Sequence, residues 1–124
     1  MTVRRAIVVV PDLFFSTRIG AAAKALGVEV DEVDAARALD ACRARPPDLV
    51  ILDLHAPGDP LALARALGAD HATRAVPIVG FYSHVDEALR KAAVEAGVDH
   101  VLPRSAFTVR LPALLAGHAP AGGA

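Results

Sequence analysis

The chain is predicted to be an α/β protein, in which a parallel β-sheet carries helices on both faces. Short apolar runs alternate with helical patterns five times along the sequence, and no internal repeat or linker interrupts them. Strict alternation of this kind favours a doubly wound parallel sheet. A length of 124 residues, 54% of them hydrophobic, suits one domain with a core. We expect this domain over residues 1–116 and a disordered tail over residues 117–124.

Local features of the sequence predict each of the first five elements. Residues 6–10 are an apolar, β-branched run, which favours a strand buried on both faces, and Asp12 then caps a helix that reaches residue 26. Residues 28–33 alternate valine with acidic side chains, so they should form an edge strand. A helix over 34–44 ends before two prolines, and the third strand follows at 49–54.

The second half continues the alternation. Proline begins a helix over 60–67, and an apolar run over 76–82 predicts the fourth strand. A helix over 85–96 carries acids in its first turn and stops at glycine. A short strand over 99–102 and a final helix over 106–115 complete the pattern.

Charge and composition exclude several classes of protein. Thirteen basic against fourteen acidic residues give a net charge of -1, so neither nucleic acid nor a membrane is expected as a partner. The apolar run near the N-terminus is too short for a signal peptide, and the expected localisation is cytoplasmic. The single cysteine, Cys42, is expected to be a half-buried helix residue.

One carboxylate stands out as a functional candidate. Residues 47–54 read P-D-L-V-I-L-D-L, which places Asp53 at the carboxyl end of a buried strand. Open α/β sheets bind ligands at this end of their strands. Asp53 is therefore the first residue to consider for chemistry.

Three segments resemble the receiver domains of bacterial response regulators, the CheY-like family. They are P-D-L-V-I-L-D-L at 47–54, V-P-I-V-G-F at 76–81 and A-A-V-E-A-G-V-D-H-V-L-P at 92–103. The resemblance covers nearly the whole chain and implies a flavodoxin-like sheet with strand order 2-1-3-4-5. It also places Asp53 on the aspartate that receivers phosphorylate, with a histidine kinase or a small phosphodonor as the source of the phosphoryl group.

The rest of the receiver site matches poorly. The acidic pair that holds Mg²⁺ in the family falls on Val10 and Pro11, which leaves Asp12 and Asp53 as a weak metal site. Asp12 is more simply explained as a helix cap. No other cofactor is expected.

Three further site-lining positions also depart from the family. Tyr82 replaces a small hydroxyl residue, and the neighbouring Ser83 is expected to cap the fourth helix. Arg104 replaces a lysine and keeps its charge, so it could pair permanently with Asp53 or point into solvent.

These departures predict a pseudo-receiver, a stand-alone signalling module that acts through protein contact and has no enzymatic activity. The resemblance implies that a protein partner or a second copy binds the face formed by the fourth helix, fifth strand and fifth helix, with His84, Phe107 and Arg110 as contacts. Phe107 could instead belong to the core. The alternative function is a working phosphoacceptor regulator that uses Asp53.

Other motifs in the sequence indicate different functions, but less strongly. Asp53, His55 and Gly58 spell D-x-H-x-x-G, which resembles a cobalamin-binding signature, but the motif follows the third strand and not the first. The sequence lacks a G-x-G-x-x-G phosphate loop, and Ser83, His84 and Asp86 stand too close together for a hydrolase triad.

Overall fold

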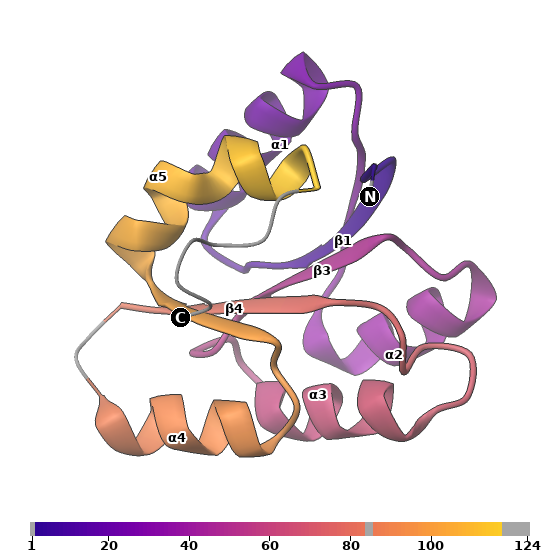
Figure 1. Ribbon diagram of the computed structural model, residues 1–124, viewed down its shortest axis with the longest axis vertical. Coiled ribbons are helices and arrows are strands. Elements are labelled where there is room, and N and C mark those ends of the chain that lie inside the picture. The colour runs from indigo at the N-terminus through magenta and orange to yellow at the C-terminus, as the bar shows by residue number, and fades with distance from the viewer. Residues whose placement is uncertain (1, 84–85, 118–124) are drawn as a thin grey trace.

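The computed structural model describes residues 2–83 and 86–117, and it confirms the predicted fold class (Figure 1). Five parallel strands form one sheet in the order β2-β1-β3-β4-β5. Each strand is followed by a helix, as the alternation of the sequence predicts. The predicted tail lies outside the described residues apart from Gly117. No helix among the described residues is long and apolar enough to span a membrane.

The strands are short and parallel, and those in the centre are buried on both faces. Every residue of β1, β3 and β4 is buried, whereas β2 at the edge of the sheet is half-exposed, which confirms its prediction as an edge strand. Burial on both faces is typical of a parallel sheet covered by helices. The strands are β1 (Arg5–Val9), β2 (Glu29–Glu32), β3 (Leu49–Asp53), β4 (Ile78–Tyr82) and β5 (His100–Pro103).

Aspartate begins four of the five helices. Asp12, Asp34, Asp59 and Asp86 each accept a hydrogen bond from the backbone N–H three residues later, which satisfies a donor that the first turn leaves unpaired. The fifth helix has Pro103 at this position and no side-chain cap. The helices are α1 (Leu13–Ala25), α2 (Ala35–Ala44), α3 (Pro60–Ala69), α4 (Glu87–Glu95) and α5 (Arg104–Leu115).

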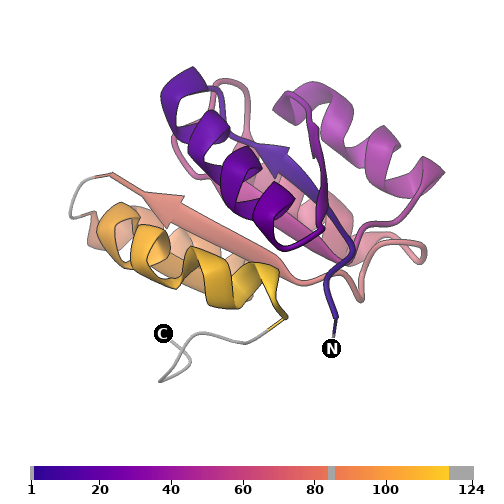
Figure 2. The same cartoon turned by 90° about the horizontal axis from the view of Figure 1, so that it is seen from above.

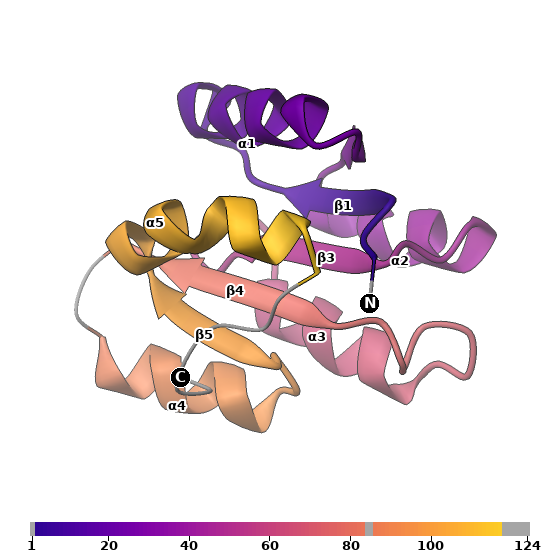
Figure 3. The same cartoon turned by 45° about the horizontal axis from the view of Figure 1, so that its top comes forward.

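The helices form two layers, one on each face of the sheet (Figure 3). Helices α1 and α5 lie side by side on one face, as the view in Figure 2 also shows, and α2, α3 and α4 cover the other. Phe15, Phe81 and Phe107 pack together beneath the α1–α5 layer, with Phe81 and Phe107 stacked at 4.8 Å between ring centroids. This aromatic cluster lies close to the carboxyl ends of the strands.

Several predicted boundaries are corrected by one or two residues. The fourth strand begins at Ile78, and the fourth helix begins at Glu87, two residues later than predicted. The fifth helix begins at Arg104, two residues earlier, because its first turn follows Pro103 directly. Gly27 and Gly97 have φ values of 72° and 99° and follow α1 and α4, which confirms the glycine stop predicted for the fourth helix and shows the same ending at the first.

Candidate functional site

Asp53 is the last residue of β3 and lies opposite Phe81 of β4 in the sheet register. Its side chain points toward the α1–α5 layer, since Ile51, two residues earlier, belongs to the core on that side. Asp53 is only 9% exposed, and its Oδ1 accepts a hydrogen bond of 2.8 Å from the backbone N–H of His55. The predicted phosphoacceptor is thus at the expected edge of the sheet, with limited access from solvent.

Asp12 has both of its carboxylate oxygens occupied. Oδ1 accepts a 3.1 Å hydrogen bond from the backbone N–H of Phe15, which confirms the predicted helix cap. Oδ2 accepts a 3.1 Å bond from the guanidinium of Arg104. The Phe15 N–H and then the Arg104 side chain hold the pKa of Asp12 below its ordinary value.

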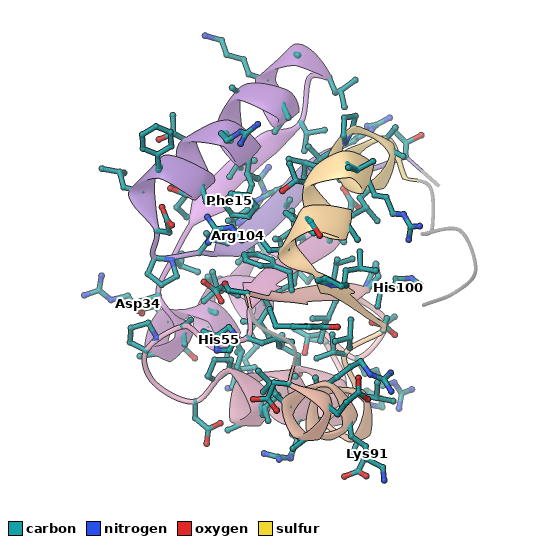
Figure 4. All side chains as sticks on the ribbon, turned by 90° about the vertical axis from the view of Figure 1, so that its left-hand side faces the viewer. Phe15, Asp34, His55, Lys91, His100 and Arg104 are labelled. Carbon is teal, nitrogen blue, oxygen red and sulfur yellow. The ribbon has the colours of Figure 1, made fainter. Side chains whose placement is uncertain are left out.

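Arg104 binds Asp12 and not Asp53, so the predicted permanent pair with Asp53 is wrong. The guanidinium carbon of Arg104 lies 4.0 Å from the centroid of the Phe15 ring, and Figure 4 shows the two side chains next to each other. A guanidinium stacked on an aromatic face is held by cation–π attraction and by contact. The ring belongs to α1, so it keeps the charge of Arg104 at the start of that helix, beside Asp12.

Val10 and Pro11 occupy the turn where the resemblance places an acidic pair. Both line a cavity of about 400 Å³ at the carboxyl ends of β1 and β2, which they share with apolar side chains such as Val33 and with the charged residues Glu32, Asp34 and Arg37. Neither Val10 nor Pro11 has a side-chain oxygen. The turn itself therefore offers no side-chain ligand for a cation.

Tyr82 is not brought together with Asp53 as a hydroxyl site. Tyr82 packs in the core on the α2–α4 side of the sheet, the side opposite to that of Asp53. Successive residues of a strand point to opposite faces, which explains the separation. Ser83 is exposed, and the cap of α4 is Asp86, so the prediction that Ser83 caps this helix is wrong.

The three residues expected to contact a partner have different environments. Phe107 is fully buried among Phe15 and Phe81, so its contact role is wrong and its alternative place in the core is confirmed. Arg110 is partly exposed on α5. His84 lies outside the described residues.

The residues around Asp53 do not fit a magnesium site of the usual kind. Mg²⁺ takes oxygen ligands in near-octahedral geometry, and in proteins one or two carboxylates usually hold it together with several waters. One of the two candidate carboxylates, Asp12, already neutralises Arg104, and Val10 and Pro11 offer no side-chain ligand. Over residues 2–83 and 86–117, no group of three His, Cys, Asp or Glu side chains could hold a metal ion.

The role of Phe15 was not found from the sequence. Asp12 and Arg104 are 92 residues apart, and Phe15 reads as an ordinary apolar position of an amphipathic helix. The only local signal was the replacement of lysine by arginine, because a planar guanidinium stacks on a ring better than an ammonium does. Which ring it would meet depends on the packing of α1 against α5.

The strand order, the helix layers and Asp53 at the end of β3 define the fold of a response-regulator receiver domain. Response regulators and receiver domains are among the solved structures that the chain resembles. A putative response regulator from Chloroflexus aurantiacus is 22% identical with a TM-score of 0.82, over 92% of this chain and 95% of that one. The receiver domain of sensor histidine kinase PA1611 from Pseudomonas aeruginosa, solved with magnesium in its active-site cleft, is 22% identical with a TM-score of 0.81 and covers the same shares.

Chemotaxis regulator CheY4 of Vibrio cholerae is 16% identical with a TM-score of 0.80, over 92% of this chain and 97% of that one. No protein-family model and no curated protein matches the sequence. At these identities the likeness establishes the fold, and the function has to be argued from the site.

Proposed function

We propose that this protein is a pseudo-receiver, a module of bacterial signal transduction that acts in the cytoplasm through protein contact. In this proposal Asp53 accepts a phosphoryl group weakly or not at all. One observation carries it: the guanidinium of Arg104 neutralises Asp12 and is held on the ring of Phe15. The carboxylate that would help Asp53 to bind a cation is already paired.

The chemistry of phosphoryl transfer explains why this pairing matters. The transferred group spreads negative charge over its oxygens, and a bound metal ion normally neutralises that charge. Val10 and Pro11 supply no metal ligand, and Asp53 is mostly buried. Without a metal ion close to Asp53, the carboxylate would have to approach an anionic donor with no metal charge to offset the repulsion.

Phosphorylation by acetyl phosphate with Mg²⁺ tests the proposal directly. Intact-mass measurement should show no added phosphoryl group, while a receiver domain that binds magnesium, treated in parallel, gains one. An added group that persists in Asp59→Asn and disappears in Asp53→Asn would refute the proposal. That result would instead support the alternative, a working phosphoacceptor regulator that depends on a histidine kinase.

A gain-of-function variant gives a second test. Pro11→Asp with Arg104→Lys restores a carboxylate to the exposed turn and removes the planar group that stacks on Phe15. This variant should bind Mg²⁺ at millimolar concentration, seen as amide shifts near Asp53 in NMR spectra, whereas the unaltered protein should not respond. Equal responses of both proteins would show that the Arg104 pairing does not block the metal.

A further inference from the structure

The cavity beside Val10 and Pro11 lies where two helices leave the sheet on opposite faces. Strand β1 is followed by α1 on one face, and its neighbour β3 is followed by α3 on the other face (Figure 3). Loops that leave neighbouring parallel strands in opposite directions open a crevice at the carboxyl ends of those strands, and open α/β sheets bind small ligands in such crevices. The strand order therefore places this cavity at a position suited to a ligand.

The cavity is separate from the site around Asp53. Neither Asp53 nor Arg104 lines it. Asp34, which does line it, lies apart from the stacked Phe15 and Arg104 in Figure 4. The walls of the cavity come instead from the turns that follow β1, β2 and β3.

Four polar side chains interrupt an otherwise apolar lining. Eight of the twelve residues that line the cavity are apolar, which suits the hydrocarbon part of a ligand. The other four are Ser16, Glu32, Asp34 and Arg37. The three charged side chains are exposed, whereas Ser16 is 5% exposed and belongs to the wall formed by α1. The cavity thus combines apolar walls with one buried hydroxyl and three charges that solvent reaches.

These polar groups retain hydrogen-bonding capacity. The Ser16 hydroxyl donates to the carbonyl oxygen of Leu13 at 3.2 Å, which leaves its own oxygen able to accept. Oδ1 of Asp34 accepts the backbone N–H of Arg37 at 2.9 Å, and Oδ2 accepts no bond from the residues that the structure describes. Among those residues, neither Glu32 nor the Arg37 guanidinium has a partner in an ion pair. Three acceptors and one guanidinium are therefore available to a ligand.

The chemistry of these groups defines a class of ligand. An ammonium group has three N–H donors, which match the three acceptors, and a guanidinium binds a carboxylate through two parallel hydrogen bonds. The two carboxylates of the lining would repel a nucleotide or another multiply charged anion. The volume of about 400 Å³ is at the lower end of the range of small-molecule pockets, so the ligand is small. A small molecule with an ammonium, a carboxylate and an apolar part is an α-amino acid.

We propose that this cavity binds a free α-amino acid with a large apolar side chain. The ammonium of the ligand binds the carboxylates of Glu32 and Asp34 and the hydroxyl of Ser16. Its carboxylate pairs with Arg37, and its side chain packs against the apolar wall that includes Val33. The inference goes beyond the proposed function, because this binding needs neither a phosphoryl group nor a protein partner.

NMR titration of the full chain with L-phenylalanine tests the proposal. The amide signals of residues 9–16 and 32–37 should shift and saturate at millimolar concentration, while those of α4 stay unmoved. Two analogues each lack one charge, since phenethylamine has no carboxylate and phenylpropionate has no ammonium. Each should bind about three- to fivefold more weakly than L-phenylalanine, because it leaves charges of the lining without a counterpart.

Matched variants test the charged groups one at a time. Arg37→Gln should weaken binding of L-phenylalanine about three- to fivefold and leave binding of phenethylamine unchanged. Arg65→Gln, at an exposed position of α3 outside the cavity, should change neither affinity. Glu32→Gln should weaken binding of both ligands, whereas Glu95→Gln, on the exposed surface of α4, should weaken neither.

Filling the cavity gives a test that does not depend on charge. Ala35 lines the cavity, and Ala36, the next residue of α2, does not. Ala35→Leu should abolish binding, whereas Ala36→Leu should preserve it. Circular dichroism checks that both variants fold. Should Ala35→Leu fail to fold, the Arg37 and Glu32 variants still decide, because both of those side chains are exposed.

Any of four results would overturn the proposal. They are no shift with L-phenylalanine at millimolar concentration, shifts confined to residues outside the cavity, equal affinity for L-phenylalanine and either analogue, and unchanged affinity in both Arg37→Gln and Glu32→Gln. None of the four depends on whether Asp53 accepts a phosphoryl group. The proposed function and the amino-acid site can therefore fail independently.

Discussion

The stacking of Arg104 on Phe15 should contribute measurably to the stability of the folded protein. The change Arg104→Gln removes the guanidinium but keeps a polar side chain that a helix tolerates. A cation over an aromatic ring at a partly exposed site is worth about 0.5–1 kcal/mol. Arg104 and Asp12 keep 36% and 43% of their side-chain surface in contact with solvent, so the ion pair itself should add little.

Urea denaturation followed by circular dichroism measures the effect. The free energy of unfolding of Arg104→Gln should fall by about 1 kcal/mol, which lowers the thermal midpoint of a domain of this size by about 4 °C. Arg110→Gln is the matched control, because Arg110 lies in the same helix, is also partly exposed and forms no ion pair with any residue that the structure describes. It should change the free energy of unfolding by less than about 0.5 kcal/mol.

A double-mutant cycle with Phe15→Leu identifies the origin of the loss. Without the ring, replacing Arg104 by glutamine should cost less than it does in the unaltered protein, because the two side chains act together. The reasoning is refuted if Arg104→Gln costs the same in both backgrounds. It is also refuted if Arg110→Gln is as destabilising as Arg104→Gln.

Asp12→Asn keeps the helix cap and removes the charge. Its cost in free energy of unfolding should be greatest at neutral pH, where the Asp12 carboxylate is ionised. Because the pKa of Asp12 is lowered from 3.8 in the folded state, this cost should disappear as pH falls through the lowered value, which acid titration of both proteins measures. Arg5→Met should lower the free energy of unfolding by about 1–3 kcal/mol in urea, since the buried Arg5 guanidinium bonds Asp31 and the carbonyl oxygen of Arg45. Cys42 is fully buried, and burial raises the pKa of its thiol. A colorimetric disulfide reagent should therefore react with it only after denaturant is added, and fast reaction in native buffer would contradict this.

Much of the fold followed from local patterns in the sequence. The apolar run over residues 49–53 has no polar interruption before Asp53, and such a run is stable only where both faces are covered. The helix starts were also predictable where aspartate stands directly before a helical pattern, as at Asp12 and Asp59. The start of α4 was missed because Ser83 and Asp86 are both good caps, and residue type alone does not decide between them.

The candidate site could likewise be predicted from the sequence only in part. Residue type and position, which the sequence contains, are enough to place Asp53 at the end of a central strand. They are also enough to show that the side chains of Val10 and Pro11 cannot hold a metal ion. That Arg104 neutralises Asp12 depends on distances between elements 92 residues apart. The burial of Phe107 likewise depends on the ring cluster that α1, β4 and α5 form together.

The sequence by itself therefore determined the α/β class, the edge strand, the cap of the first helix and the place of Asp53, because hydrophobic periodicity and capping act over a few residues. The tertiary structure alone decided the partner of Arg104, the orientation of Tyr82 away from Asp53 and the burial of Phe107. These depend on which helices lie next to each other and which face of a strand each side chain takes, and neither follows from local sequence.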